Sequence, residues 1–405
     1  MRLLFISPRF PYPTLKGDQL IVFNRIKGLS KNFKIVLMTF YENESELQNL
    51  SELDQYCERI ITIKIGPISI KKNLINGLLR NKLPLQVNYY ASKKFQQNLD
   101  QVLLLHKIDL IHCFTLRLAE YCKNLDIPVI YELIDSMQLN LQNMIREERF
   151  FKKLAYKIEM ERMTLYEKSL CEKQKYISVV SKKDKQRIGF DHINVIPNGV
   201  DVSKALPSDR KHRLHAELTL PPDTPLIGCV SRLSAEKRVE DVIRALALLE
   251  DSTPHLVLIG DGPQKVNLVR ITESLDLADR VHFLGERRDK DIIFHDLSLY
   301  VLASSFEGMS NSLMEAMVSE CPVAVSAIDA NMALVGNNLR GWTFQVGHVQ
   351  GLVDVVTAIL HSPEQVNCRT RAARVHIERH YTEQRMLQAW QALLEKGQSR
   401  DVNSE

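Results

Sequence analysis

Two glutamates, Glu307 and Glu315, flank a stretch of the chain that is rich in Gly, Ser and Asn. Residues 299–303 before it form a short apolar run typical of a buried strand, and a helical apolar pattern follows it. In an open parallel sheet, ligands bind where a strand passes through a loop into a helix. The free N–H groups and the dipole of such a helix N-terminus favour an anion such as phosphate. The stretch therefore suits a sugar diphosphate, with loop amides for the phosphates and the two carboxylates for hydroxyl groups.

A structural alternative applies to the same residues. Ser312, followed three residues later by Glu315, fits a capping box in which Glu315 only closes the first turn of the helix. The two interpretations are about equally favoured by this stretch alone, so the choice depends on the rest of the chain.

Three other polar loops come directly after strand patterns in the same half of the chain, at residues 231–237, 260–263 and 285–287. Because the carboxyl ends of parallel strands meet at one edge of a sheet, we expect all four loops to project on the same side. Arg232 and Lys237 would bring positive charge to the edge where the helix amides lie. Together these loops favour a phosphate site over a set of unrelated turns.

Composition limits the class of protein. The chain has 405 residues, which is too long for one ordinary core and suits two domains. No apolar run approaches the ~20 residues of a membrane span, and the apolar start at residues 3–6 is too short for a signal peptide. The seven cysteines are odd in number and form no CxxC pair, so we expect reduced thiols in a cytoplasmic protein.

Alternating strand and helix patterns run through the chain twice, which predicts an α/β protein with two doubly wound parallel sheets. The strands expected in the first half are residues 3–7, 35–39, 60–65, 110–113, 129–131 and 176–180, with helices over 19–30 and 150–173. Those expected in the second half are residues 226–230, 256–259, 281–284 and 299–303, with helices over 239–249 and 266–275.

These patterns predict the domain boundaries. We expect an N-terminal acceptor-binding domain over 1–190, a C-terminal donor-binding domain over 191–380, a C-terminal helix over 381–397 that crosses back to the first domain, and a flexible tail over 398–405. The hinge is expected near 190–202, with a ligand cleft between the carboxyl ends of the two sheets.

The motifs of residues 190–325, taken in order, resemble the retaining GT-B glycosyltransferases of family 4, the glycosyl transferases group 1. The matching stretches are 195–201, Ser231-Arg232 with Glu236-Lys237, 260–263, 281–285, and Glu307-Gly308 with Glu315-Ala316-Met317. The N-terminal half matches more loosely, although residues 9–13 with Gly17-Asp18 resemble a subgroup associated with bacterial exopolysaccharide assembly. The resemblance implies a GT-B fold, in which two Rossmann-like domains face each other across a cleft.

The resemblance also implies roles for single residues. Arg232 and Lys237 would neutralise the donor diphosphate and stabilise it as the leaving group. Glu307 would accept hydrogen bonds from the transferred sugar, and Glu315 from the ribose. Gly17, which has no Cβ, would let the backbone approach the diphosphate. The other donor-binding residues implied are Asp18, Gly260, Glu286, Arg287, Gly308, Met309, Ser310, Asn311 and Ser312.

The N-terminal half departs from the family at one catalytic position. Where the family usually has His after the strand at 129–131, this chain has Ile134, and Asp135 follows. His112, at the end of another strand, is the other candidate, although a lone His at a strand end is more often structural. Asp135 and His112 therefore both remain catalytic candidates.

Asp289 and Asp291 fit the Asp-x-Asp signature of metal-dependent glycosyltransferases. They also lie just before a predicted helix, where Asp is the expected cap. Since Arg232 and Lys237 already supply positive charge, we expect no metal ion and no other cofactor.

The expected function is that of a hexosyltransferase. It would move a hexose from a UDP- or GDP-sugar to a saccharide or lipid-linked saccharide with retention of configuration, in cell-surface polysaccharide biosynthesis, with no nucleic-acid partner. The alternative is a nucleotide-sugar epimerase of the same fold, which would need acid and base groups around C2 of the sugar.

A basic first half suggests a further partner. Residues 1–180 carry 27 Lys and Arg against 19 Asp and Glu, whereas the remainder carries 26 against 30. Within residues 68–83, apolar residues recur at helical spacing and basic residues cluster at the ends: Leu74, Ile75, Leu78 and Leu79, with Lys71, Lys72, Arg80 and Lys82. Such a segment is typical of peripheral contact with an anionic membrane, although the same stripe is about as typical of a core helix.

Overall fold

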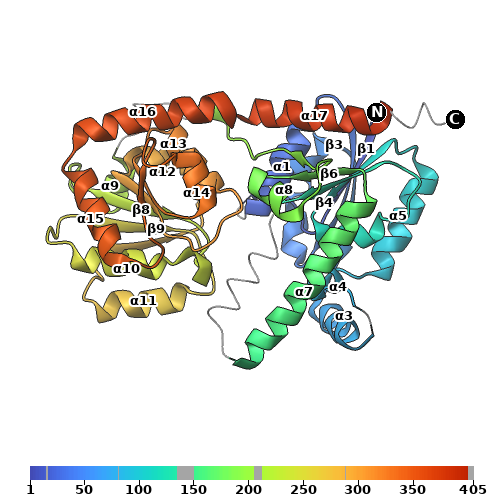
Figure 1. Ribbon diagram of the computed structural model, residues 1–405, viewed down its shortest axis with the longest axis horizontal. Helices are drawn as coiled ribbons and strands as arrows, with labels where there is room; N and C mark the ends of the chain where they lie inside the picture. The colour runs from blue at the N-terminus through green and yellow to red at the C-terminus, as the bar shows by residue number, and fades with distance from the viewer. Residues whose placement is uncertain (15–16, 81, 135–149, 205–211, 288, 400–405) are drawn as a thin grey trace. The chain divides into compact units, whose positions relative to one another are not determined.

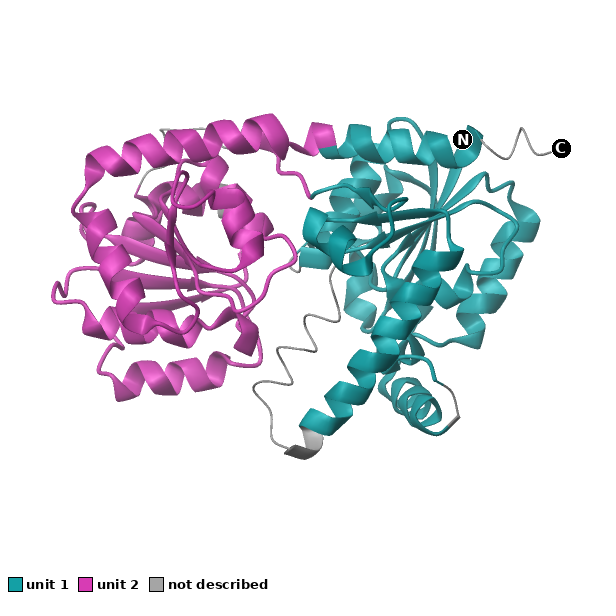
Figure 2. Ribbon diagram, in the orientation of Figure 1, with its two compact units in different colours: residues 1–197, 386–405 teal, residues 198–385 magenta. Residues whose placement is uncertain are grey.

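The computed structural model describes residues 1–14, 17–80, 82–134, 150–204, 212–287 and 289–399. Figure 1 shows its helices and strands. The chain divides into two compact units (Figure 2). Unit 1 holds Met1–Pro197 with Met386–Glu405, and unit 2 holds Asn198–Arg385. The expected tail at 398–405 is described only to Ser399, where the last helix ends, and residues 400–405 lie outside the described residues.

Unit 1 is built on a parallel sheet of seven strands among the described residues, in the order β3-β2-β1-β4-β5-β6-β7. The strands are β1 (Arg2–Ser7), β2 (Lys34–Tyr41), β3 (Cys57–Lys64), β4 (Leu110–Phe114), β5 (Val129–Leu133), β6 (Tyr176–Val179) and β7 (Asn194–Val195). The α-helices are α1 (Gly17–Leu29), α2 (Ser51–Asp54), α3 (Pro67–Arg80), α4 (Leu85–Tyr89), α5 (Lys93–Leu105), α7 (Phe150–Lys173), α8 (Lys182–Ile188) and most of α17 (Glu383–Ser399).

Unit 2 holds a second parallel sheet, with six described strands in the order β10-β9-β8-β11-β12-β13. They are β8 (Leu226–Val230), β9 (His255–Ile259), β10 (Val281–Gly285), β11 (Leu299–Leu302), β12 (Val323–Ser326) and β13 (Trp342–Phe344). The α-helices are α9 (Arg213–Glu217), α10 (Val239–Leu248), α11 (Lys265–Ser274), α12 (Lys290–Asp296), α13 (Asn311–Val318), α14 (Asp329–Val335), α15 (Val349–Leu360) and α16 (Pro363–His380).

Each sheet is covered on both faces, which explains why its strands are continuous apolar runs rather than alternating ones. In unit 1, α1 and α17 pack on one face and α5, α7 and α8 on the other. In unit 2, α12, α13, α14 and α16 form one hydrophobic cluster with the sheet, and α10, α11 and α15 form the other. The predicted pair of doubly wound parallel sheets is confirmed.

One strand runs further than its pattern predicts. The expected strand at 129–131 continues through Glu132 to Leu133 and pairs with β4 and β6. The expected strand ended at residue 131, and a carboxylate in a buried strand is costly unless it is paired. The structure supplies Glu132 with two partners in the core, and that compensation allows the strand to continue.

The partners of Glu132 form a buried polar cluster. Arg25 of α1 donates from Nη2 to Oε1 at 3.0 Å, and Nε2 of His112 lies 2.7 Å from Oε2. All three side chains are almost inaccessible to solvent. Trp390 of α17 packs against the cluster, with the Arg25 guanidinium 4.2 Å from its ring centroid and the His112 ring stacked at 4.6 Å. The cluster therefore joins two helices and two strands in the core of unit 1.

Glycine is required where the chain enters unit 2. A Cβ on Gly199 would lie within 3 Å of backbone atoms of Thr382 and Glu383. The close approach is held by hydrogen bonds from Val200 N to Tyr381 O and from Glu383 N to Val200 O, each 2.9 Å. The glycine of the 195–201 motif thus lets the two connecting segments of the chain run side by side.

Removing the carboxylate charge of Glu132 should destabilise unit 1, because it leaves the Arg25 guanidinium buried without a counter-ion. We expect Glu132→Gln to lower the free energy of unfolding by about 3–5 kcal/mol, and the pair Arg25→Met with Glu132→Leu to recover most of it. Urea unfolding followed by Trp390 fluorescence in a Trp342→Phe background measures this. Glu44→Gln, which breaks the exposed pair with Lys64, should leave the midpoint unchanged. If Glu132→Gln and Glu44→Gln lost the same free energy of unfolding, the assignment of Glu132 as the buried counter-ion of Arg25 would be wrong.

Candidate functional site

The four polar loops of unit 2 lie together at one edge of its sheet. They follow β10, β9, β8 and β11, which are neighbours in that order. Backbone hydrogen bonds join each loop to the next: Gly260 N donates to Gly285 O at 2.7 Å, Leu233 N to Asp261 O at 3.0 Å, and Ser305 N to Glu236 O at 2.8 Å. The loops therefore form one connected surface, as the strand-end argument predicts.

Two glycines allow the loops after β8 and β9 to touch. Gly260 has a φ of +131°, and a Cβ there would overlap the carbonyl oxygen of Ser231. A Cβ on Gly262 would overlap the carbonyl oxygen of Leu233. The Gly-Asp-Gly-Pro stretch is thus needed for packing at this edge, beyond the turn that its composition indicates.

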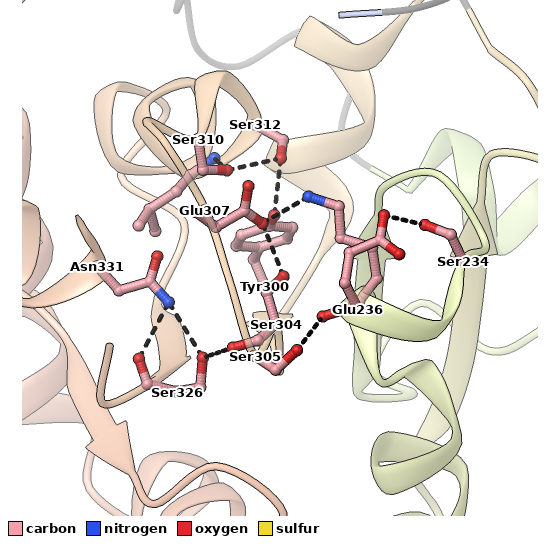
Figure 3. Close-up of polar contacts among 12 residues, drawn as sticks. Ser234, Glu236, Tyr300, Ser304, Ser305, Glu307, Ser310, Ser312, Ser326 and Asn331 are labelled. Carbon is pink, nitrogen blue, oxygen red and sulfur yellow. Dashed lines mark hydrogen bonds and ion pairs between the residues drawn. The ribbon is translucent and has the colours of Figure 1, made fainter. Parts of the chain in front are cut away.

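An ion pair lies at the centre of the loops. Lys237 donates from Nζ to Oε1 of Glu307 at 2.6 Å, and Ser304 Oγ donates to the same oxygen at 2.7 Å (Figure 3). Both charged side chains are largely buried. An ammonium group has three N–H donors, and within the described residues Lys237 uses one of them. Its remaining donors can hold an anion while Glu307 keeps its orientation.

Two residues that the sequence analysis did not identify, Ser326 and Asn331, hold the backbone next to Glu307 through hydrogen bonds. Ser326 Oγ donates to the carbonyl of Ser304, and Asn331, which is fully buried, donates from Nδ2 to Ser326 O at 3.0 Å and to Ser326 Oγ at 3.2 Å (Figure 3). These bonds fix the backbone at Ser304, whose hydroxyl binds Glu307. Ser326 ends β12, the neighbour of β11. In the sequence, the sign that could have identified Ser326 is a polar residue at the end of an apolar strand.

The N-terminus of α13 presents unpaired backbone donors. Ser310 is its N-cap, and its hydroxyl accepts from Leu313 N at 3.2 Å. The capping box at Ser312 and Glu315 is therefore not the cap that forms. Among the described residues, the backbone N–H groups from Gly308 to Ser312 have no hydrogen-bond partner. Five consecutive free amides at a helix start are a ready site for an anion or a hydroxyl-rich ligand.

Both glutamates act on a buried tyrosine of β11. The hydroxyl of Tyr300 pairs with Ser312 Oγ at 2.9 Å, at the base of the amide-bearing loop (Figure 3). Burial raises the pKa of Tyr300 well above its usual value, and the negative charges of Glu307 and Glu315 raise it further. The two carboxylates that flank the loop in sequence thus also lie close enough to Tyr300 to raise the pKa of its hydroxyl group.

Of the other predicted site residues in unit 2, some have side chains that are free to bind a ligand, and others already form ion pairs within the protein. Arg232 and Glu286 are exposed, and neither has an ion-pair partner among the described residues. Arg287 instead donates to both oxygens of Asp289 at 2.9 and 2.7 Å and to Glu217 at 2.6 Å. These bonds raise the pKa of its guanidinium. Arg287 therefore reaches a ligand only if this network opens.

The Asp-x-Asp stretch is occupied in part by that network. Asp289 stands at the N-cap of α12, as predicted, but its carboxylate accepts from Arg287 and makes no cap hydrogen bond. The side chain of Asp291 lies outside the described residues. Within the described parts of the chain, no group of three or more His, Cys, Asp or Glu side chains is placed to hold a metal ion.

The predicted residues of unit 1 lie at two different depths. Gly17 and Asp18 begin α1, a Cβ on Gly17 would meet nothing within 4 Å, and Asp18 pairs with Arg9 at 2.6 Å. His112 is 0% exposed and belongs to the buried cluster with Glu132. Asp135 lies outside the described residues. A side chain without accessible surface does not touch a substrate, so we assign His112 a structural role.

The pH dependence of stability tests that role. Burial lowers the pKa of His112, and the positive charge of Arg25 adds to this, while Glu132 opposes it. Since the unfolded chain then binds the proton more readily than the folded one, the contribution is complete above about pH 6.5 and is lost as pH falls towards the folded-state pKa. We expect the urea midpoint to fall between pH 7.5 and 5.5 by more in the wild type than in His112→Gln. Equal falls would refute a buried neutral histidine.

Comparison with known proteins places these features in context. Residues 210–376 match the family model described as Glycosyl transferases group 1, and this region lies within unit 2. The chain is 29% identical over 188 residues to a 2-deoxystreptamine glucosyltransferase of Streptomyces kanamyceticus, a match that covers 45% of this chain and 49% of the relative. It is 27% identical over 201 residues to the UDP-Gal:alpha-D-GlcNAc-diphosphoundecaprenol alpha-1,3-galactosyltransferase of Escherichia coli, covering 48% and 49%. The chain thus spans about half the length of these relatives.

Structural likeness extends over both units. The crystal structure of HepE from Anabaena in complex with UDP and glucose superposes with a TM-score of 0.74, covering 98% of this chain and 100% of that one at 18% identity. At this identity the likeness is one of fold. Two parallel-sheet α/β units of the GT-B class are present, as the sequence predicts.

Proposed function

We propose that this protein is a retaining glycosyltransferase that moves a hexose from a UDP- or GDP-sugar to a saccharide or lipid-linked saccharide. The observation that carries the proposal is the Lys237–Glu307 pair beside five free amides at the start of α13, on one edge of one sheet. A cation and unpaired amides suit a diphosphate, and a fixed carboxylate suits sugar hydroxyls. The family match over residues 210–376 covers this same edge.

The proposed chemistry places positive charge where negative charge develops. As the bond between the sugar and the diphosphate breaks, Lys237 and the exposed Arg232 stabilise the leaving phosphate oxygen. Glu307 orients the transferred sugar, and Glu315 accepts from the ribose. With these cations present, the reaction needs no divalent ion. Retention follows if the acceptor attacks from the face that the diphosphate leaves, and the leaving phosphate takes the acceptor proton.

Several features support the choice of acceptor and setting. The E. coli relative is named for a GlcNAc-diphosphoundecaprenol acceptor, and the Streptomyces relative for 2-deoxystreptamine. Residues 9–13 with Gly17-Asp18 resemble the exopolysaccharide subgroup, so we favour a lipid-linked saccharide in cell-surface polysaccharide assembly. All seven cysteines are free, which suits a cytoplasmic setting. None of the described helices is long and apolar enough to span a membrane.

The matches to transferases disfavour the epimerase alternative.

A transfer assay tests the reaction. Purified protein is incubated with radiolabelled UDP- and GDP-hexoses and a crude lipid-linked acceptor, and the product is analysed by NMR for anomeric configuration. We expect labelled acceptor with the configuration of the donor and full activity in EDTA. Epimerised donor without transfer would refute the proposal. Loss of activity in EDTA with rescue by Mn²⁺ would restore Asp289 and Asp291 as metal ligands.

Substitution of the two cations tests the donor site. Arg232→Ala and Lys237→Ala should each lower kcat by at least ~10²-fold, because each removes charge stabilisation that grows in the transition state. Arg244→Ala serves as the matched control, since Arg244 forms an exposed pair with Glu240 on α10 of the same unit. The control should keep normal turnover. Thermal unfolding should be unchanged in Arg232→Ala and in the control, whereas Lys237→Ala, which leaves Glu307 without its ion-pair partner, should lower the unfolding temperature. Normal turnover in both site variants would refute their assigned role.

A further inference from the structure

The side of helix α3 that packs against the rest of unit 1 is not its most apolar side. Its outward face carries large apolar side chains whose exposed fractions are high: Ile68 83%, Ile75 55%, Leu78 59% and Leu79 78%. Its inward face carries Asn73 and Gly77, with Ile70 packed against the core. An amphipathic helix normally buries its apolar stripe. In α3 the side chains of Ile68, Ile75, Leu78 and Leu79 face solvent, and Leu74 is half-buried.

Specific contacts hold α3 in this orientation. Asn73 donates from Nδ2 to the carbonyl of Ala91 at 2.7 Å. Gly77 lies so close to Asn88 that a Cβ would overlap that side chain, and its carbonyl accepts from Arg162 Nη1 at 3.2 Å. A rotation that buried the apolar stripe would break these hydrogen bonds and push a bulky side chain against Asn88. The outward stripe is therefore built into the fold.

Two lysines lie among the exposed apolar side chains of α3, with Lys71 between Ile75 and Leu78 around the helix. Both lysines are exposed, and neither has an ion-pair partner among the described residues. Long lysine side chains beside an apolar stripe can reach outward to anionic headgroups while the stripe enters the acyl boundary.

The neighbouring helix α7 also exposes apolar side chains, although the carboxylate of Glu161 lies on the same side. It touches α3 through Arg162, and its exposed side includes three large apolar residues at helical spacing, Leu154, Ile158 and Leu165. Both helices belong to unit 1, as Figure 2 shows. The first 180 residues also carry the positive excess of the chain, 27 Lys and Arg against 19 Asp and Glu. The apolar surface and the charge excess thus occur in the same unit.

We propose that the outward face of α3, which also carries Lys71 and Lys72, docks on the surface of an anionic lipid bilayer. A second copy of the chain fits this face less well, because α3 has no Asp or Glu and a two-fold contact between two α3 helices would set the same lysines against each other. The proposal deepens the proposed function by naming the surface at which a lipid-linked acceptor is met. Its test, however, needs no transferase activity.

Vesicle binding by the full chain tests the docking surface. The wild type should sediment with phosphatidylcholine vesicles that contain about a third phosphatidylglycerol, less so at high salt, and not with phosphatidylcholine alone. Ile75→Glu with Leu79→Glu should weaken binding roughly tenfold or more, because each places a charge in the acyl boundary. Lys71→Gln with Lys72→Gln should weaken binding to anionic vesicles at low salt.

The matched control is a second pair of exposed leucines in unit 1. Leu104 and Leu105 at the end of α5 are 85% and 70% exposed, so Leu104→Glu with Leu105→Glu makes the same change elsewhere on the surface. This control should bind anionic vesicles as the wild type does. Thermal unfolding with and without UDP checks that every variant is folded and still binds the nucleotide.

Three results would overturn the proposal. The first is a wild type that ignores anionic vesicles at low salt, and the second is equal binding by the α3 and α5 variants. The third is a dimer in analytical ultracentrifugation that is lost in Ile75→Glu with Leu79→Glu, since a second copy would then cover the face. A protein that binds vesicles but transfers no sugar contradicts only the proposed transferase. One that transfers sugar but does not bind vesicles contradicts only this proposal.

Discussion

The candidate site depends on the parallel pairing of four strands in unit 2. Because β10, β9, β8 and β11 run in the same direction, their carboxyl ends meet at one edge and all four loops leave from it. Beyond the strands, the loop backbone has no sheet partner, so its polar groups must pair with one another or remain available. Some pair from loop to loop, and these bonds hold the surface together. Those from Gly308 to Ser312 remain available, and they are the donors that a ligand can use.

The buried ion pairs of the two units differ in their access to solvent. In unit 1 the Arg25–Glu132 pair is sealed from solvent and joined to His112 and Trp390, an arrangement that fixes α1 and α17 on the sheet. In unit 2 the Lys237–Glu307 pair keeps some accessible surface, and its ammonium group retains unused donors. A sealed pair has little left to offer a ligand, whereas a partly open one can exchange part of its bonding for a phosphate. The same chemistry thus supports the fold in one place and suits binding in the other.

Helix α3 shows that polar contacts can decide which side of a helix is buried. Hydrophobic burial alone would turn Ile75 and Leu79 inward. The bonds of Asn73 and the close approach of Gly77 to Asn88 hold the opposite face against unit 1. Exposed apolar patches mark interaction surfaces in other proteins, and Lys71 and Lys72 on this face favour an anionic partner.

The sequence by itself determined many of the elements and their order, although β7, β12 and β13 were not among the strands it predicted. Long apolar runs and helical stripes depend on near neighbours in the chain, so the strands at 226–230 and 299–303 and the helix at 150–173 were predictable to within about a residue or two. The parallel topology then followed from chain-order rules, and with it the meeting of the four loops at one edge.

Only the tertiary structure decided which partner each polar group takes, because those partners are distant in sequence. Glu132 lies in a buried strand since Arg25 and His112 reach it from other elements, and no local pattern shows this. Ser310 caps α13 in place of Ser312, and Arg287 is engaged by Glu217 and Asp289 rather than free. The orientation of α3 was undecided in sequence for the same reason: a stripe shows that a helix has two faces, and only the packing around it selects the one that is buried.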